Sequence, residues 1–166
     1  IVIIYSGSIS EWQSFGMLKE FVLSILETEN RIKIIFLCKL NMVLDELIEK
    51  YPKRVMQRYV SDKEVIHYLD VSDYGLLIRE NSLTNKVASP VKCAEYLSRG
   101  LKVIISSSIG DYSQEIINNK LGVIYNRRSL SLNSIYDKDC QIKYAKENLS
   151  KNSSKIIDKY MNLLKI

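Results

Sequence analysis

The stretch that decides the fold is residues 79–106, R-E-N-S-L-T-N-K-V-A-S-P-V-K-C-A-E-Y-L-S-R-G-L-K-V-I-I-S. It follows one apolar run of strand length and ends in another. Between the two runs lie a polar loop and a short helix, with Ser89 at the N-cap, Pro90 in the first turn and Gly100 at the end. Strand, loop, helix and strand in this order form one βαβ unit.

The N-terminus of the short helix is a favourable binding site for phosphate, because it carries partial positive charge and free N–H groups. Lys92 and Glu95 are three residues apart and therefore share one face of this helix. A cation and a carboxylate in this arrangement can hold a phosphate and a sugar hydroxyl of one ligand.

Apolar runs and helical patterns alternate along the whole chain. Strands are expected at 1–5, 32–37, 55–59, 74–78, 103–105 and 122–125, and helices at 12–26, 42–51, 62–69, 90–98 and 112–118, with a helical tail at 142–164 broken near 150–154. The strands are continuously apolar, which is typical of a parallel sheet buried on both faces. We therefore predict an α/β fold, a doubly wound, Rossmann-like parallel sheet of about six strands with helices on both faces, which binds ligands at the carboxyl ends of its strands.

The composition of the chain excludes several classes of function. The chain has 166 residues, 24 basic and 19 acidic side chains and a net charge of +5, without a helix-turn-helix, zinc-finger or RNA-binding motif, so we expect no nucleic acid partner. The mild positive charge suits an anionic small ligand, an anionic membrane surface, or solubility alone. A single histidine and three scattered cysteines predict no metal site and buried free thiols. No run approaches the ~20 apolar residues of a membrane span and no signal peptide is visible, so we expect a cytoplasmic protein.

The first strand is followed by a short turn, Gly7–Ser8, with one glycine. It matches neither a dinucleotide fingerprint nor a P-loop, and it lacks the acidic cluster of a magnesium-binding receiver domain. Two interpretations stay open: the turn brings backbone N–H groups to a phosphate, or it is a plain tight turn.

Other polar residues also have two interpretations. Glu95 is either solvated at the helix edge or bonded to a ligand. Its position one turn into a helix that follows a strand end favours the interpretation that it binds a ligand. Arg79 and Glu80 directly follow an apolar strand, where functional residues gather, and Lys39 is a lesser candidate of the same kind. His67 is expected to be structural or solvated. In the C-terminal tail, lysines alternate with apolar residues. This tail either packs on the domain or makes peripheral contact with the inner face of the membrane.

These stretches resemble the C-terminal, donor-binding domain of bacterial GT-B glycosyltransferases, and of glycosyltransferase family 4 in particular. Residues 89–106, S-P-V-K-C-A-E-Y-L-S-R-G-L-K-V-I-I-S, are similar to the family stretch P-x-K-x-x-E-Y-L-A-x-G-x-P-V-I. Residues 71–80, V-S-D-Y-G-L-L-I-R-E, and 59–69, Y-V-S-D-K-E-V-I-H-Y-L, resemble two further family segments in the same order.

The resemblance implies a set of donor-binding residues. Glu95 corresponds to the second glutamate of a paired motif, which binds the ribose hydroxyls, and Val60 to a backbone contact with the base. Gly7 and Ser8 face the donor phosphates, and Lys92 stands beside Glu95 where a diphosphate lies.

Three departures from the family pattern are visible. The first glutamate of the pair should stand eight residues before Glu95, where this chain has Val87, and Glu80 is the nearest substitute. Ser8 and Gln13 occupy the positions of an arginine and a lysine that stabilise the leaving diphosphate. Lys92 and Arg79 are the candidates to replace these cations.

The implied activity is retaining transfer of a sugar from a nucleotide-diphospho-sugar to an acceptor hydroxyl, in cell-surface polysaccharide biosynthesis and without a bound metal. Lys92, Arg79 and Glu80 are the predicted catalytic residues. The diphosphate would lie on the backbone of Ser89, Pro90 and Val91, and Asn85 or Glu80 would touch the transferred sugar.

We expect residues 1–166 to be this donor domain alone. The first residues already read as a core strand, and an N-terminal domain that binds a sugar or lipid-linked acceptor would be absent, so the piece should bind donor without turnover. Two alternatives stay open, a non-catalytic GT-B-like scaffold and an unrelated doubly wound nucleotide-binding module.

Overall fold

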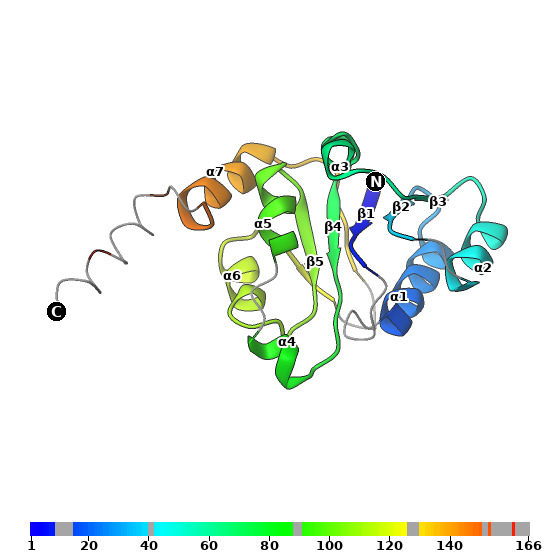
Figure 1. The fold of residues 1–166 in the computed structure, drawn as a ribbon, viewed down its shortest axis with the longest axis horizontal. Helices are drawn as coiled ribbons and strands as arrows, with labels where there is room; N and C mark the ends of the chain where they lie inside the picture. Colours follow the sequence, from blue (N-terminus) through cyan, green and yellow to red (C-terminus); the bar gives the residue numbers. More distant parts are fainter. Residues whose placement is uncertain are drawn as a thin grey trace.

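A computed structural model describes residues 1–8, 15–39, 42–87, 91–125 and 130–150, together with Ser153 and Met161. The described residues form one twisted sheet with helices on both of its faces (Figure 1).

All six strands are parallel and follow the order β3-β2-β1-β4-β5-β6. Their bounds are β1 Val2–Ser6, β2 Lys33–Leu37, β3 Val55–Arg58, β4 Tyr74–Leu77, β5 Lys102–Ile105 and β6 Gly122–Ile124. The chain moves outward from β1 in one direction and returns to β4 on its other side. The strand order therefore reverses between β1 and β4, which makes this point the expected ligand site of the sheet.

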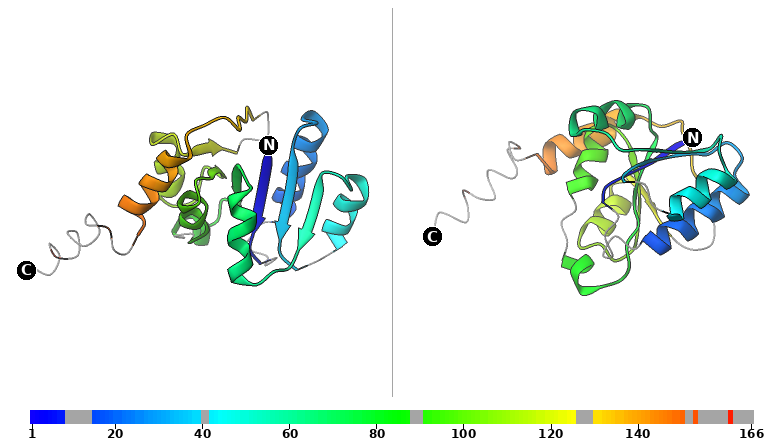
Figure 2. Two further views of the ribbon diagram at one scale, coloured as in Figure 1. Left: turned by 90° about the horizontal axis from the view of Figure 1, so that it is seen from above. Right: turned by 45° about the vertical axis from the view of Figure 1, so that its right-hand side comes forward.

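The helices are divided between the two faces, as right-handed crossovers require (Figure 2). On one face, α1 and α2 pack against Ile3, Ile34 and Phe36, and on the other, α3, α5, α6 and α7 cover Ile4, Val103 and Ile105. The helix bounds are α1 Phe15–Thr28, α2 Met42–Lys50, α3 Asp62–Asp70, α4 Leu83–Val87, α5 Val91–Ser98, α6 Tyr112–Asn118 and α7 Lys138–Asn148.

The predicted fold class is confirmed, and each predicted strand is found with bounds that differ by no more than one residue at either end. The prediction of a loop over all residues between β4 and α5 is wrong, because α4 forms there. The Ser82 hydroxyl accepts a hydrogen bond from the Asn85 N–H (3.2 Å), which satisfies a donor of the first turn and starts the helix.

Two further expectations need correction at the C-terminal end. The last described helix, α7, begins at Lys138 and not at residue 142, because the Asp137 carboxylate accepts a hydrogen bond from the Asp139 N–H (2.9 Å) and caps it. Most of the remaining tail lies outside the described residues. Cys38 and Cys93 are buried as expected, whereas Cys140 is exposed near the start of α7.

A tight contact between α5 and the sheet fixes the helix in place. Gly75 in β4 has no side chain, and a Cβ there would overlap with the ring of Tyr96, which is fully buried. The Tyr96 ring therefore lies directly on the β4 backbone. Because α5 carries Lys92 and Glu95, this contact sets where both side chains stand relative to the strand ends.

Gly75→Ala is expected to lower the free energy of unfolding by about 1–3 kcal/mol, since the new methyl group forces the Tyr96 ring and α5 away from β4. Urea denaturation measures this change. Gly16→Ala in α1 is the matched control, because a Cβ there meets nothing within 4 Å, and it should be neutral or stabilising. Equal stability of Gly75→Ala and the parent would contradict the packing described.

Candidate functional site

The carboxyl ends of β1, β4 and β5 meet at the switch point of the sheet. Ser6 ends β1, and Gly7 and Ser8 follow it, while Arg79 comes two residues after β4 and Ser106 directly after β5. The strand ends are joined by hydrogen bonds, among them one of 2.8 Å from the Arg79 main-chain N–H to the Ser106 hydroxyl. Three chain segments that are far apart in the sequence therefore form one rigid edge.

The turn after β1 is fixed by Tyr5. The Tyr5 hydroxyl donates a hydrogen bond of 2.6 Å to the Ser8 carbonyl, and the Gly7 N–H donates one of 3.2 Å to the Leu37 carbonyl of β2. A Cβ at Gly7 would stand 3.3 Å from the Tyr5 hydroxyl oxygen, so a larger residue would crowd this bond. A side chain at this position would therefore have to displace the Tyr5 hydroxyl by a few tenths of an ångström.

Arg79 is the buried cation of this edge, with only 5% of its surface exposed. Burial lowers the pKa of its guanidinium, and the nearby hydroxyls of Tyr5 and Tyr96 oppose that shift. An arginine stays protonated under such a shift, so a positive charge is held below the surface.

A small cavity connects Arg79 with Lys92. Its volume is only about 10 Å³, and it is lined by Tyr5, Ser6, Leu76, Leu77, Ile78, Arg79 and Lys92. The two cations predicted to replace the missing family residues therefore come from different elements and line the same cavity.

Lys92 and Glu95 lie in the first turns of α5 and contact each other. The Lys92 Nζ donates a hydrogen bond of 2.6 Å to Glu95 Oε2, and 34% of the lysine and 37% of the glutamate side chain are exposed. The prediction that they share one helix face is confirmed. Both groups are within reach of solvent, and Lys92 also lines the cavity.

Tyr96 is a residue of the site that the sequence analysis missed. Its hydroxyl accepts a hydrogen bond of 3.1 Å from the buried Ser6 N–H at the end of β1. Burial raises its pKa well above the usual tyrosine value, and the Ser6 bond opposes that shift. The signal was the tyrosine directly after Glu95, which on an apolar helix face reads as an ordinary core residue.

Asn85 and Glu80 differ in their surroundings. Asn85 in α4 is 1% exposed, and its side-chain amide donates a hydrogen bond of 3.0 Å to the Glu80 carbonyl. Its Oδ1 atom is buried and accepts no hydrogen bond from the described residues. Glu80 itself is exposed. Asn85 therefore anchors the loop after β4 and retains an acceptor.

The remaining candidates are not brought into this cluster. Val60 is half-buried after β3, which β2 separates from β1. Val91 is 70% exposed at the start of α5, whereas Ser89 and Pro90 lie outside the described residues. His67 is exposed on α3, in agreement with the interpretation of a solvated residue.

A metal-ligand cluster and a membrane-spanning helix are both absent from the described ranges. They contain no group of three or more His, Cys, Asp or Glu side chains placed to hold a metal ion. None of the helices described is both long and apolar enough to cross a membrane.

Comparisons with known proteins show what the fold is similar to. No protein-family model matches the sequence, and no curated protein matches it either. Among solved structures, the C-terminal domain of LpcC, a glycosyl transferase group 1 family protein from Francisella tularensis, has a TM-score of 0.56 at 14% identity over 96% of this chain and 85% of that one.

Two longer proteins share the same fold over one part of their chains. TarM has a TM-score of 0.65 at 14% identity, and WaaG, a glycosyltransferase involved in lipopolysaccharide biosynthesis, has 0.61 at 13%. The match covers 99% of this chain in both cases but only 35% of TarM and 46% of WaaG. The chain thus has the Rossmann-like fold of the C-terminal domains of GT-B glycosyltransferases.

Tyr96→Phe is expected to lower the free energy of unfolding by about 1–3 kcal/mol, because it leaves the buried Ser6 N–H without its acceptor. Chemical denaturation measures the loss. Tyr59→Phe, at an exposed tyrosine, is the control and should change stability little. A Tyr96→Phe protein as stable as the parent would show that the hydroxyl is dispensable.

The dependence of protein stability on alkaline pH tests the burial of the Tyr96 hydroxyl independently. Because burial raises the pKa of Tyr96 above 10.0, the folded state keeps a proton that the unfolded state loses, so stability falls as pH rises past about 10. One such group contributes a slope of about 1.4 kcal/mol per pH unit. Removing it in Tyr96→Phe should reduce the slope of unfolding free energy against pH by about this amount, and an unchanged slope would contradict the assignment.

Proposed function

We propose that this chain is the nucleotide-sugar-binding domain of a glycosyltransferase. The observation that carries the proposal is that Arg79 and Lys92 line one cavity at the switch point, and that Glu95 forms an ion pair with Lys92. Two cations from separate elements next to a helix N-terminus suit a diphosphate. The shared fold with LpcC, TarM and WaaG supports the same assignment.

The two cations would act on the leaving group. When the bond between sugar and diphosphate breaks, negative charge grows on the diphosphate, and fixed positive groups stabilise that charge without having to reorganise. Arg79 is buried and held at the edge of the sheet, so its position is set before the ligand arrives. Lys92 is half-exposed and provides an adjustable charge at the entrance.

The Lys92–Glu95 ion pair would be exchanged for contacts with the donor. An ion pair this exposed stabilises a protein by only about 0–1 kcal/mol, so opening it costs little. A diphosphate would take the lysine and a ribose hydroxyl would donate to the glutamate. A ligand with both groups therefore satisfies both side chains at once.

The finer parts of the proposal concern the sugar and the reaction. We assign Asn85 Oδ1, a buried acceptor, or the Glu80 carboxylate to hydroxyls of the transferred sugar, and the turn at Gly7–Ser8 to the phosphates. Val60 would contact the base through its backbone, and Ser89 and Pro90 would stand by the diphosphate. The reaction would retain the anomeric configuration without a metal, with an acceptor bound by a partner domain, in surface polysaccharide biosynthesis.

A second candidate function is a donor-binding scaffold that does not turn over. The neutral turn at Gly7–Ser8 favours it, since arginine and lysine are missing where related enzymes carry them. Both candidates require nucleotide binding, whereas only the first requires sugar transfer by the protein at its natural length. A third reading, an unrelated nucleotide-binding module, would show no preference for sugar conjugates.

Isothermal titration calorimetry with UDP, GDP and their sugar conjugates tests the proposal. We expect micromolar binding of one base series, with the same affinity with and without Mg²⁺. Binding of no nucleotide diphosphate would overturn the proposal for this chain, and binding only with Mg²⁺ would overturn its metal independence.

Lys92→Ala and Glu95→Ala locate the ligand. Each should weaken binding of the preferred nucleotide by about tenfold or more, because each removes a charged hydrogen-bond partner. Lys50→Ala is the matched control, since Lys50 forms an ion pair of 3.0 Å with Glu27 on the α1–α2 side of the sheet. Equal effects of all three variants would place the nucleotide elsewhere.

A further inference from the structure

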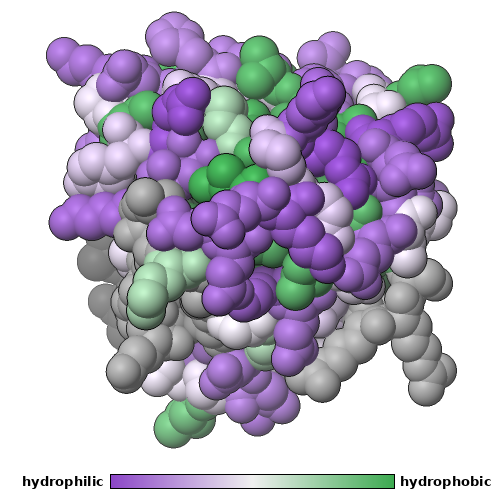
Figure 3. Space-filling view, turned by 90° about the vertical axis from the view of Figure 1, so that its right-hand side faces the viewer, coloured by the Kyte–Doolittle hydropathy of each residue, from purple (hydrophilic) through white to green (hydrophobic). Residues whose placement is uncertain are grey.

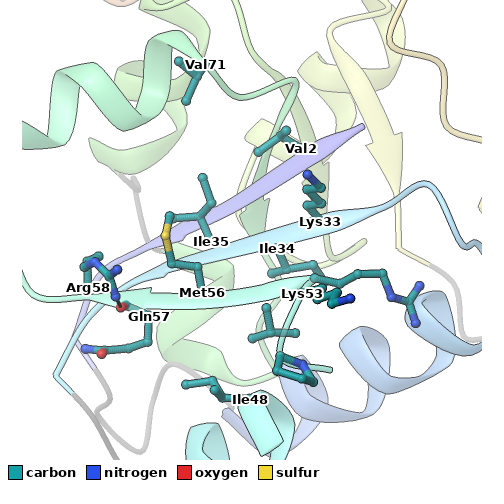
Figure 4. Close-up of a pocket in the computed structure, with 13 residues that line it drawn as sticks. Val2, Lys33, Ile34, Ile35, Ile48, Lys53, Met56, Gln57, Arg58 and Val71 are labelled. Atoms are coloured by element: carbon teal, nitrogen blue, oxygen red, sulfur yellow. Dashed lines mark hydrogen bonds between the residues drawn. The ribbon is translucent and has the colours of Figure 1, made fainter. Parts of the chain in front are cut away.

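A second cavity lies at the opposite end of the sheet from β6, along the outer edge of β3. It has a volume of about 590 Å³, and the consecutive residues 52–58 form one of its walls. Figure 4 shows β3 running through the middle of the cavity with side chains above and below it. The cavity is therefore a groove that follows one open strand edge, and we call it the β3 groove.

The floor of the β3 groove is apolar. Val2, Ile35 and Met56 line it on one face of the sheet, and Ile34 and Ile48 line it on the other (Figure 4). From the side of α2 and β3, most of the surface is hydrophilic, and hydrophobic residues appear as small, separate groups among polar side chains and at the edges of the view (Figure 3). An occupant would thus need apolar side chains to fill a recess inside a polar rim.

The rim carries four cations. Arg58 stands at one end of β3, and Lys53 and Lys33 stand at the other (Figure 4). Arg54, which follows Lys53 in the sequence, is the fourth. Within the described part of the chain, none of the four forms an ion pair with a carboxylate. The occupant of the groove is therefore expected to be acidic at both ends.

The outer edge of β3 can also form main-chain hydrogen bonds with an added strand. The Ile34 N–H donates to the Arg54 carbonyl and the Cys38 N–H to the Arg58 carbonyl, so alternate residues of β3 face β2. Val55 and Gln57 lie between them and face outward, and among the described residues β3 pairs with β2 alone. The Gln57 carbonyl accepts from the Arg58 guanidinium (2.8 Å) and the Val55 N–H donates to the Tyr51 carbonyl (2.9 Å). Within the described part of the chain, the Val55 carbonyl and the Gln57 N–H remain for a partner strand.

We propose that the β3 groove binds an extended acidic peptide, which adds to β3 as an outer strand. Its main chain pairs with Val55 and Gln57, its apolar side chains lie on the floor, and acidic residues at its ends contact Lys53 and Arg58. Addition of a strand to an exposed sheet edge is a known mode of peptide recognition. The site is separate from the proposed donor site, so neither depends on the other.

The same features argue against other occupants. A second copy of this chain that paired along β3 in the antiparallel direction would bring Lys53 of one copy close to Arg58 of the other, and like charges repel. A flat bilayer surface cannot enter a recess that reaches Ile35 and Met56. Single-stranded nucleic acid usually stacks on aromatic side chains, and among the described residues no aromatic side chain lines the groove.

Fluorescence anisotropy with a labelled Glu-Glu-Val-Thr-Val-Glu-Glu peptide tests the proposal on the 166-residue chain. We expect saturable binding that weakens as salt rises, because exposed charges are screened. The same peptide with proline in place of threonine should bind about tenfold more weakly, since it lacks a main-chain donor. A peptide with lysines in place of the glutamates should not bind.

Charge reversal locates the peptide. Lys53→Glu with Arg58→Glu should weaken binding by roughly five- to thirtyfold, from the loss of two exposed ion pairs. Arg54 is left intact, because its guanidinium donates to the Leu26 and Glu29 carbonyls at the end of α1. Lys63→Glu with Lys143→Glu is the control, which changes the net charge equally at exposed positions outside the groove.

The expected result is loss of binding in the groove variant alone, with melting curves that show both variants folded. Equal weakening by both variants would overturn the proposal, because it would mean unspecific charge attraction. Failure of the acidic peptide to bind, or binding of anionic phosphatidylglycerol vesicles in its place, would overturn it as well. Equal affinity of the proline peptide would overturn the strand pairing.

Discussion

The candidate site depends on the contact of Tyr96 with two strands. The ring lies on the bare backbone of Gly75 in β4, and the hydroxyl accepts a hydrogen bond from the Ser6 N–H at the end of β1. β1 and β4 are the strands between which the chain order reverses. One side chain of α5 therefore joins the helix to both sides of the point where a doubly wound sheet binds its ligand.

This contact of Tyr96 with β1 and β4 explains how a site with few charged residues can be preorganised. Arg79 is held below the surface by its place after β4 and by its main-chain bond to Ser106. Lys92 and Glu95 extend from the helix that Tyr96 holds. The buried cation and the exposed pair differ in solvent exposure, which suits the first to charge stabilisation and the second to ligand entry.

The sequence was sufficient to predict the fold because its strands are continuously apolar and alternate with helical patterns. The grouping of Lys92 with Glu95 was also predictable, since residues three apart share a helix face. The role of Tyr96 was not, because a tyrosine on an apolar helix face reads as core, and its partner Ser6 is ninety residues away. Helix α4 escaped prediction because it is a single capped turn within a polar stretch.

The β3 groove could not be found from the sequence for a different reason. Lys33 and Arg58 are unremarkable surface residues one at a time, and only the pairing of β2 with β3 at the edge of the sheet brings them to one rim. Strand order is set by the packing of the whole domain, so a groove that depends on it has no local signal. The same is true of the cavity between Arg79 and Lys92.

The central claim, that the switch point holds a nucleotide diphosphate, is tested most directly by backbone amide NMR shifts of the chain during titration with UDP and GDP. Binding at the switch point should shift the amide signals of residues 6–8, 79–80 and 91–96 and leave those of 52–58 almost unchanged. Shifts confined to residues 52–58, or none at saturating nucleotide, would contradict it.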